Sequence, residues 1–451
     1  MIELDGRRAL VIGYGRSGRA AASYLKRQGG SVTVVDRADT RELRAALERD
    51  GLTGHLGESA TPDLDRFDLV VVSPGVAWDS PLVEAARQRG IEVTSEIDLF
   101  FEVCPCPIAG ITGTNGKTTT TALTADVLRA GGLTVIRGGN IGETILDRVD
   151  QLRPGDWVVL ELSSFQLESI RRPRLRIGAV LNVTPDHLDR HKTMQRYRDI
   201  KARAVTFMEP EDHAVLNFDD PSCKAMARQT RGQVVPFAVR NQLESGIQVF
   251  DGAIGRKDGA GLLAVLPVRE VPLPGAHNLS NVMAAVAAGL AAGVATSAIA
   301  EAVRQFKAVE HRLELTGTYN GVRWYNDSKA TNPDSTYKAL EAFSEPIVLI
   351  AGGRNKGIEL APLAAAIAGR VTGLVAIGET GAELAQLVRG AGLDRVVVAS
   401  DLRDAVRRAA SMATPGSVVV LSPAFTSFDM FRDYEDRGRQ FKATVLEELG
   451  A

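Results

Sequence analysis

The sequence predicts an α/β protein of three domains. Its 451 residues allow two to four domains at roughly 150 residues each. Apolar, β-branched runs alternate with Ala-, Leu- and Arg-rich amphipathic stretches, a pattern typical of parallel sheets covered by helices. Because this alternation restarts three times, we place the domains at residues 1–105, 106–309 and 310–451.

The first domain is predicted to be Rossmann-like. An apolar strand at residues 8–13 leads into a glycine-rich turn and a helix that ends near Gln28, and further strands are expected at residues 31–36 and 69–75. The turn Gly13-Tyr14-Gly15-Arg16-Ser17-Gly18 and Asp36 at the end of the next strand match a dinucleotide site. A lone G-x-G-x-x-G turn also serves other diphosphates or plain strand-to-helix packing, so the ligand stays open.

The central domain is predicted to be a P-loop ATPase-like unit. It starts after residues 101–107, where two prolines interrupt regular structure. A strand at residues 107–112 precedes Gly113-Thr114-Asn115-Gly116-Lys117-Thr118-Thr119, and a helix follows over 118–130. Backbone N–H groups of such a turn surround phosphates, the lysine neutralises their charge and the first threonine reaches Mg²⁺. The motif is a short form of the P-loop, since Ile111 replaces the first glycine of the longer pattern.

Polar residues follow two more strands of this domain. Glu161 ends one apolar run, and Asp186 and His187 come directly after another. Such groups beside a P-loop are suited to holding Mg²⁺ against a transferring phosphoryl group. Lys201 lies on the next helix, on a face whose spacing indicates an ordinary charged surface. An Ala-rich helix over 281–306 is expected to close the domain.

The third domain is predicted to be Rossmann-like again, with strands within residues 346–353, 373–378, 395–400 and 416–424. Polar residues that could meet a ligand lie on both sides of the boundary between the second and third domains: Asn278, Asn281, Arg312, Asp327, Lys329 and Thr331. Helix caps explain the two amides equally well. The Asp-x-Lys-x-Thr set offers both charge signs after a strand, which suits a ligand site or a surface turn.

Composition excludes several classes of partner. With 53 basic and 55 acidic residues, the net charge of -2 provides no general attraction for nucleic acid or an anionic membrane. No apolar run approaches the ~20 residues of a membrane span, and no signal peptide opens the chain, so a cytoplasmic protein is expected. Three cysteines neither build a disulfide framework nor form a C-x-x-C metal pair.

Six motifs occur in the order found in Mur ligases, so the chain resembles that family over nearly its whole length: GTNGKTTT, ELSSFQL, NVTPDHLDRH, GAHNLSN, EHRLE and NDSKATNP. The ending LSPAFTSFDMFRDYEDRGRQF, without a D-N-P-R signature, resembles the branch that adds D-glutamate. The resemblance implies that ATP phosphorylates the carboxylate of UDP-N-acetylmuramoyl-L-alanine and that D-glutamate attacks the acyl phosphate, in peptidoglycan precursor synthesis.

The resemblance also assigns roles to residues. It implies catalytic roles for Lys117, Glu161, His187, Lys201 and Lys329. For ATP it implies Gly113, Thr114, Asn115, Gly116, Lys117, Thr118, Thr119, Asn278, Asn281, Arg312 and Asp327. For the UDP-substrate it implies Arg16, Ser17, Asp36, Arg37, Gly75 and Asn140. For D-glutamate it implies Asp186, Lys329, Thr331, Lys356, Ser427, Phe428 and Tyr434, although Tyr434 stands where the family often has Phe.

The resemblance implies two Mg²⁺ sites, built from Thr118, Glu161, His187 and Lys201. In this family the lysine is carbamylated by CO₂, which turns a cation into an anionic ligand. Because the implied ATP contacts come from two domains and the substrate contacts from all three, we predict that the domains close around the substrates. We expect a monomer.

Three other functions stay open at this stage. An NAD-dependent oxidoreductase would explain the first glycine turn and Asp36 but not the P-loop. A noncatalytic nucleotide switch would not explain the third domain. Another Mur-family ligase could take a different amino acid; a folylpolyglutamate synthase-like role is disfavoured because a glycine-rich domain precedes the P-loop.

Overall fold

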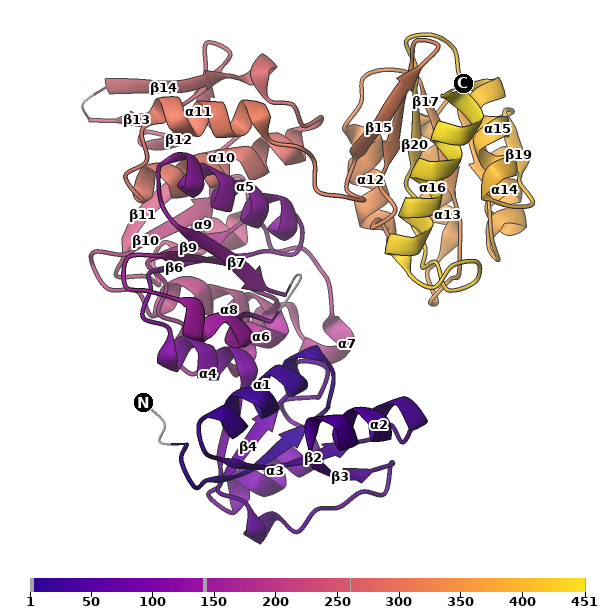
Figure 1. Cartoon of the computed structure of the whole chain (residues 1–451). Helices are drawn as coiled ribbons and strands as arrows, with labels where there is room; N and C mark the ends of the chain where they lie inside the picture. Colours follow the sequence, from indigo (N-terminus) through magenta and orange to yellow (C-terminus); the bar gives the residue numbers. More distant parts are fainter. Residues whose placement is uncertain (1–3, 141–143, 260, 451) are drawn as a thin grey trace. The chain divides into compact units, whose positions relative to one another are not determined.

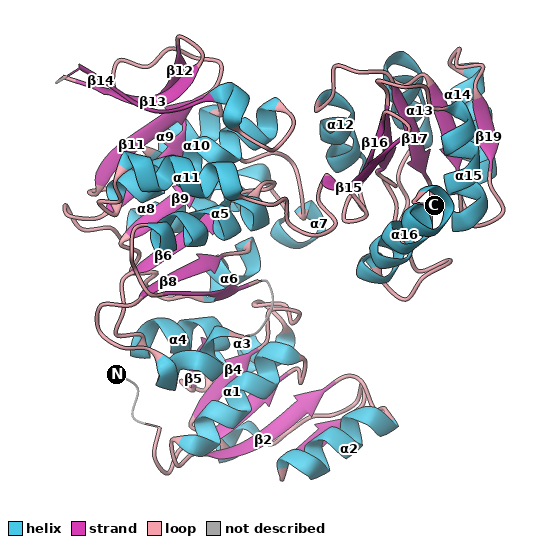
Figure 2. Cartoon of the chain, turned by 45° about the horizontal axis from the view of Figure 1, so that its top comes forward, coloured by secondary structure: helices cyan, strands magenta, loops and turns pink. Residues whose placement is uncertain are grey.

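A computed structural model describes residues 4–140, 144–259 and 261–450, within which three sheets follow one another along the chain (Figures 1 and 2). The chain forms two compact units. The first comprises Met1–Val268 and Ser280–Val303, and the second comprises Arg269–Leu279 and Arg304–Ala451. Among the described helices, none is long and apolar enough to cross a membrane.

The first sheet has the Rossmann-like arrangement that the sequence predicts. Its parallel strands have the order β3-β2-β1-β4-β5. The chain adds strands on one side from β1 to β3 and on the other side from β4 to β5. Open α/β sheets bind ligands at this change of side, which here lies between β1 and β4. The strands are β1 (Arg8–Ile12), β2 (Ser31–Asp36), β3 (Thr53–Leu56), β4 (Leu69–Val72) and β5 (Glu92–Ser95). The helices are α1 (Arg16–Arg27), α2 (Arg41–Asp50), α3 (Pro81–Gln88) and α4 (Glu96–Val103), with a short η1 (Leu64–Arg66).

Both faces of this sheet are covered because apolar residues run continuously along its central strands. Ala9 and Val11 of β1 belong to the core on the side of α1 and α2. Leu10 and Ile12 belong to the core on the side of α3. A strand buried on both faces is typical of parallel sheets.

The central sheet has the strand order β14-β13-β12-β11-β10-β9-β6-β8-β7. Its strands are β6 (Ile108–Thr112), β7 (Val135–Gly139), β8 (Trp157–Glu161), β9 (Ile177–Val180), β10 (His213–Asn217), β11 (Gln233–Ala238), β12 (Gly246–Phe250), β13 (Ala253–Asp258) and β14 (Gly261–Pro267). Its helices are α5 (Lys117–Ala130), α6 (Ser164–Ser169), α7 (Leu188–His191), α8 (Met194–Thr206) and α9 (Pro221–Met226), with η2 (Ile145–Gln151) and η3 (Val268–Glu270).

The predicted helix over 281–306 is wrong as a single element. The structure has two helices there, α10 (Ala276–Ala291) and α11 (Thr296–Gln305). Gly293 has a φ of 80° and its N–H donates to the Leu290 carbonyl at 3.0 Å. A left-handed glycine of this kind ends a helix, so alanine content alone overestimates its length.

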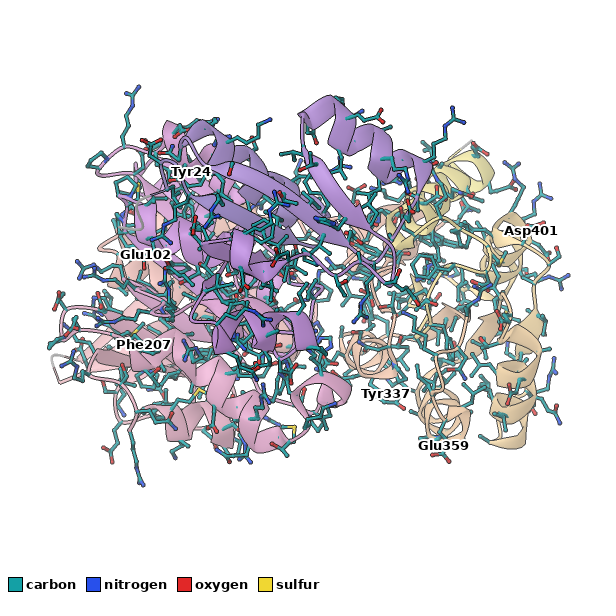
Figure 3. All side chains as sticks on the ribbon, turned by 90° about the horizontal axis from the view of Figure 1, so that it is seen from below. Tyr24, Glu102, Phe207, Tyr337, Glu359 and Asp401 are labelled. Carbon is teal, nitrogen blue, oxygen red and sulfur yellow. The ribbon has the colours of Figure 1, made fainter. Side chains whose placement is uncertain are left out.

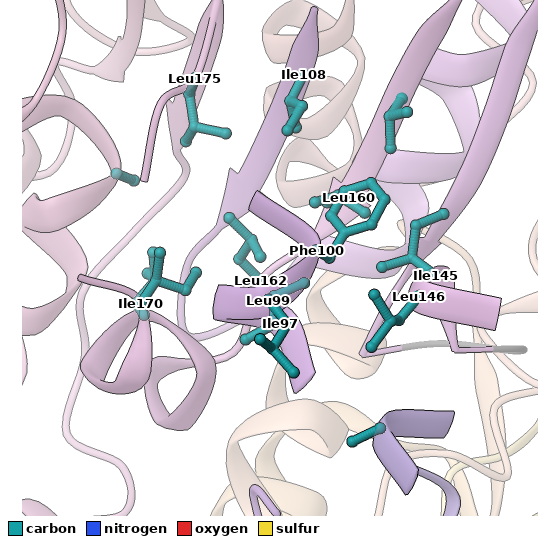
Figure 4. Close-up of a cluster of buried hydrophobic side chains, with 14 of the residues drawn as sticks. Ile97, Leu99, Phe100, Ile108, Ile145, Leu146, Leu160, Leu162, Ile170 and Leu175 are labelled. Atoms are coloured by element: carbon teal, nitrogen blue, oxygen red, sulfur yellow. The ribbon is translucent and has the colours of Figure 1, made fainter. Parts of the chain in front are cut away.

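Helix α4 joins the first domain to the central sheet. On its outer side Glu102, labelled in Figure 3, lies 3.5 Å from Arg171, which also pairs with buried Asp98 at 2.8 Å. On its inner side Ile97, Leu99 and Phe100 pack into a buried cluster with the central domain (Figure 4). Partners in that cluster include Ile145, Leu146 and Leu160. The two domains of the first unit therefore share one hydrophobic core.

The second unit carries a six-stranded sheet with the order β15-β16-β20-β17-β18-β19, parallel except for β15. The strands are β15 (Glu314–Tyr319), β16 (Val322–Asn326), β17 (Ile347–Ala351), β18 (Gly373–Ala376), β19 (Val396–Val398) and β20 (Val418–Leu421). The helices are α12 (Pro333–Glu341), α13 (Leu360–Arg370), α14 (Gly381–Gly390), α15 (Leu402–Met412) and α16 (Tyr434–Leu449). Separate apolar cores cover its two faces, as the predicted Rossmann-like fold requires.

Candidate active site

The phosphate loop lies between β6 and α5, where the sequence predicts it. Gly116 has a φ of 84°, and a Cβ on it would lie 2.1 Å from Oδ1 of Asn281. Lys117 folds back over the loop, because its Nζ donates to the carbonyls of Gly113 (3.0 Å) and Thr114 (2.8 Å). Thr118 and Thr119 are buried in the first turn of α5. The amine therefore lies over the turn that would hold phosphates.

The loop after β9 holds the phosphate loop in place. Asn182 and Asn115 exchange two hydrogen bonds, of 2.8 Å to the Asn182 side-chain oxygen and 3.1 Å to the Asn115 carbonyl. The Thr114 hydroxyl donates to the Thr184 carbonyl at 3.1 Å and accepts from the Thr184 N–H at 3.0 Å. Sequence reasoning missed Asn182 and Thr184, although both belong to the NVTPDH run.

Glu161 has the features of a cation ligand. Its side chain is buried, and Oε1 accepts a hydrogen bond from Asn140 Nδ2 at 3.0 Å. Oε2 is buried and has no hydrogen-bond partner among the described residues. A carboxylate oxygen buried without a partner is costly, and a bound cation would offset that cost. Carboxylate and hydroxyl oxygens are the ligands that Mg²⁺ prefers, so Glu161 and Thr118 fit that metal.

His187 and Asp186 lie at the N-terminal end of the short helix α7. His187 has a φ of 52°, in the left-handed region, and its ring centroid lies 5.0 Å from that of Phe165. Asp186 accepts the His187 N–H at 3.0 Å and lies 3.5 Å from its Nε2. Both side chains are about half exposed, so the imidazole is accessible to a metal or a substrate.

Lys201 is buried, with only 1% of its surface exposed. The interpretation of its helix face as a charged surface is therefore wrong, because α8 turns this face toward the interior. Its Nζ lies 4.6 Å from the ring centroid of Tyr197. Burial, followed by the positive charge of Lys117, lowers the pKa of Lys201 well below its usual value. Burial therefore favours the uncharged amine, which is the form that acts as a nucleophile.

A cavity of about 790 Å³ opens at the carboxyl ends of β1 and β4 and reaches the central domain. All six residues that the resemblance implies for the UDP-substrate line it: Arg16, Ser17, Asp36, Arg37, Gly75 and Asn140. Ser73, Gln166 and Arg190 line it too, and sequence reasoning missed these three. Its volume lies in the range of ligand pockets.

Asp36 shapes the glycine turn at this cavity. One oxygen accepts the Tyr14 N–H at 2.7 Å and the other accepts the Ala38 N–H at 2.9 Å. The Ser73 hydroxyl donates to the Gly13 carbonyl at 2.7 Å. These bonds hold the turn open around the start of α1, whose N–H groups suit an anionic ligand.

In the second unit, most residues implied for D-glutamate lie in two loops, one after β16 and one after β20. Lys329 Nζ lies 5.2 Å from the ring centroid of Tyr434, and Lys356 Nζ lies 5.9 Å from that of Phe428. Ser427 is buried. The Thr331 N–H donates to the Lys329 carbonyl at 2.9 Å. Asp186 is the one member of this set that belongs to the first unit.

Arg437, which sequence reasoning missed, donates hydrogen bonds to both of these loops. Its guanidinium is buried and donates to the Ser328 carbonyl at 2.8 Å and to the Phe425 carbonyl at 3.2 Å. Ser328 precedes Lys329, and Phe425 lies two residues before Ser427. No sequence signal singles out Arg437, because a lone arginine on a predicted helix looks like any solvent-exposed cation.

Residues implied for ATP occur in both units. In the second, Asp327 accepts the Ser422 hydroxyl at 2.8 Å and the Leu313 N–H at 3.2 Å. Burial raises the pKa of Asp327 to about 7. Asn278 donates to the Pro274 carbonyl at 2.7 Å, and Arg312 is partly buried.

Comparison with known proteins identifies the class. The description "Mur ligase MurD-like, N-terminal domain" matches residues 7–95, "Mur ligase middle domain" matches 111–289, and "Mur ligase, glutamate ligase domain" matches 311–425. The chain therefore belongs to the Mur ligase family of ATP-dependent, amide-bond-forming enzymes. This family excludes the oxidoreductase and switch alternatives.

Two named relatives match this chain over nearly its whole length. A protein of Koribacter versatilis is 44% identical over 450 residues, with 98% of each chain covered. One of Pelotomaculum thermopropionicum is 42% identical, with 98% of this chain and 97% of the relative covered. Both carry the name UDP-N-acetylmuramoylalanine--D-glutamate ligase.

Solved structures agree on the fold. The ADP complex of MurF ligase from Thermotoga maritima has a TM-score of 0.61 at 16% identity and covers 99% of this chain and 95% of its own. MurC, the UDP-N-acetylmuramate-alanine ligase of the same organism, has a TM-score of 0.59 at 20% identity and covers 98% and 99%.

Proposed function

We propose that the chain joins D-glutamate to UDP-N-acetylmuramoyl-L-alanine, using ATP and Mg²⁺, as a step of peptidoglycan precursor synthesis. The names of relatives that match it nearly end to end support this substrate pair. The observation that carries the proposal is the cavity, which runs from the glycine turn at α1 to Asn140. Asn140 in turn bonds the candidate metal ligand Glu161, so a long nucleotide-linked substrate could span both sites.

The UDP-substrate would lie along this cavity with its diphosphate at the N-terminus of α1. Backbone N–H groups there, together with Arg16 and Arg37, meet negative charge. Its alanine carboxylate would lie beside Asn140, close to Glu161. ATP would bind the phosphate loop, where Lys117 can exchange its two carbonyl contacts for phosphate oxygens.

The chemistry proceeds in two displacements. A carboxylate oxygen of the substrate attacks the γ-phosphorus, the bond to ADP breaks, and an acyl phosphate forms. The uncharged amine of D-glutamate then attacks the acyl carbon, phosphate leaves with that oxygen, and the amine loses its proton. Lys117 neutralises charge on the transferring group. Mg²⁺, held by Thr118, Glu161 and His187, would offset further charge.

We propose that Lys201 reacts with CO₂. The neutral amine forms a bond to the carbon, a proton leaves, and an anionic carbamate results. Its burial and its lowered pKa support this reaction, because a protonated ammonium has no lone pair and would repel Mg²⁺. The carbamate would be a ligand of a second Mg²⁺ ion.

D-glutamate would bind the second unit, whose Lys329 and Lys356 suit an anion. The residues implied for ATP and D-glutamate come from both units, and closure of the domains stays a prediction. We place the enzyme in the cytoplasm, where ATP and UDP-linked precursors occur, and expect a monomer. The domain bounds 1–105, 106–309 and 310–451 stay predictions.

Phosphate release by the purified protein tests this function. ATP, Mg²⁺ and UDP-N-acetylmuramoyl-L-alanine are supplied with D-glutamate, L-glutamate, D-alanine or diaminopimelate, and product mass is recorded. We expect coupled product with D-glutamate alone. Preference for a different amine would move the chain to another branch of the family.

A further inference from the structure

We infer that Arg190 is a positioning residue that couples filling of the UDP-substrate cavity to the placement of His187. This inference deepens the proposed function and rests on it. It concerns the short helix α7, which lies between the candidate metal ligand His187 and the first domain.

Arg190 connects the two domains of the first unit at the cavity. Its guanidinium donates to the carbonyl of Val76 at 2.8 Å, and Val76 follows Gly75 in the loop after β4. The same guanidinium lies 5.1 Å from the ring centroid of Phe165 in the central domain. Both Arg190 and Val76 line the cavity. Because one hydrogen bond uses few of the N–H donors of a guanidinium, others can meet substrate oxygens.

His187 depends on this helix for its position. It has a φ of 52° at one end of α7, and Lys192 has a φ of 67° at the other. Left-handed conformations of non-glycine residues cost free energy and persist when their surroundings fix them. The His187 carbonyl accepts the N–H groups of Arg190 (3.1 Å) and His191 (2.9 Å). Movement of α7 therefore moves His187.

Two side chains of α7, His191 and Arg190, anchor the helix, and both pack against Phe165. His191 is buried, lies 2.9 Å from the Ser164 hydroxyl through Nε2, and stacks on the rings of Phe165 and Tyr197 at 5.3 Å. That anchor lies wholly within the central domain. Arg190 provides the other anchor, and its partner Val76 belongs to the first domain. Of these two anchors, Arg190 is the one that lines the cavity and can therefore meet a ligand there.

A nucleotide-sugar diphosphate in the cavity would strengthen this anchor. It would exclude water from the bond to Val76 and offer phosphate or hydroxyl oxygens to the remaining donors, and hydrogen bonds of charged groups strengthen in such surroundings. His187 would then be held where a metal needs it. Coupling of this kind is reciprocal, so bound metal would also tighten substrate binding.

Two variants and a matched control test the inference. Arg190→Gln removes the charge, Arg190→Lys keeps it without the planar fork, and Arg174→Gln changes an exposed arginine of the same domain that does not line the cavity. Substrate dissociation constants are measured by calorimetry, and binding of Mn²⁺ to the ADP complex is measured by EPR with and without UDP-N-acetylmuramoyl-L-alanine. The thermal unfolding midpoint of each variant shows whether it is folded. Its ADP affinity shows whether the phosphate loop is intact.

For Arg190→Gln we expect substrate affinity to fall about tenfold or more, the loss typical of a hydrogen bond to a charged group. Substrate should tighten Mn²⁺ binding in the native protein and in Arg174→Gln, but not in Arg190→Gln. Arg190→Lys should recover part of the affinity and less of the coupling. ADP affinity should stay within about twofold.

Equal substrate tightening of Mn²⁺ binding in Arg190→Gln and the native protein would overturn the inference, as would unchanged substrate affinity. The two proposals fail separately. A native protein that forms no product from any amine would refute the proposed function, whereas the Mn²⁺ titrations decide the role of Arg190 without turnover.

Discussion

Replacing Gly116 by alanine tests how the phosphate loop is built. Gly116 has a φ of 84°, which costs an L-residue roughly 1–2 kcal/mol. The new Cβ would also lie 2.1 Å from Oδ1 of Asn281, so the amide must move, at a further cost of about 1–3 kcal/mol. We expect the free energy of unfolding to fall by the sum and ATP affinity to fall at least about tenfold.

Gly132 provides a matched control. Its φ is 82°, and a Cβ on it would meet no atom within 4 Å. Gly132→Ala should therefore show the backbone cost alone and bind ATP as the native protein does. Chemical denaturation gives the free energies of unfolding, and calorimetry with a nonhydrolysable ATP analogue gives the affinities. If both variants lose the same stability and bind ATP equally, the packing of Asn281 against Gly116 has no role in nucleotide binding.

Two further predictions concern buried ionisable groups. The pKa of Asp327 is raised from 3.8 to about 7, so the folded chain holds this proton more tightly and stability falls as pH rises through that window. Asp327→Asn should flatten this decline in denaturation measured from pH 4 to 7, and an unchanged slope would contradict the assignment; its ATP affinity should fall. Lys201→Ala should abolish turnover, and the native protein supplied with ¹³C-bicarbonate should show a carbamate signal by NMR that the variant lacks. A signal of equal size in the variant would exclude Lys201 as its source.

Local sequence pattern predicted the strands and glycine turns of the two candidate phosphate sites. Strands β1, β2 and β6 and the phosphate loop have short apolar runs and glycine turns whose signal lies within a few residues. Sequence pattern failed for residues whose burial is set by tertiary packing. Spacing placed Lys201 on a charged face, because it cannot show that α8 is covered by other elements.

Contacts between segments that lie far apart in the chain could not be predicted from sequence pattern either. The bonds of Arg190 to Val76 and of Arg437 to Ser328 and Phe425 join residues far apart in the chain. Local pattern predicted the glycine turn and Asp36 at the cavity, but Asn140 was named through the family resemblance, since neither spacing nor composition brings it next to the first domain. The shared core at α4 likewise joins domains that sequence pattern separates at residues 101–107.

In the proposed mechanism the substrate carboxylate is phosphorylated before the amide forms. The direct measurement uses UDP-N-acetylmuramoyl-L-alanine labelled with ¹⁸O in its carboxylate, turned over with ATP, Mg²⁺ and D-glutamate, with mass analysis of the released phosphate. An acyl phosphate transfers one labelled oxygen to each phosphate released. Phosphate without ¹⁸O, formed alongside the amide product, would show that the carboxylate is not phosphorylated.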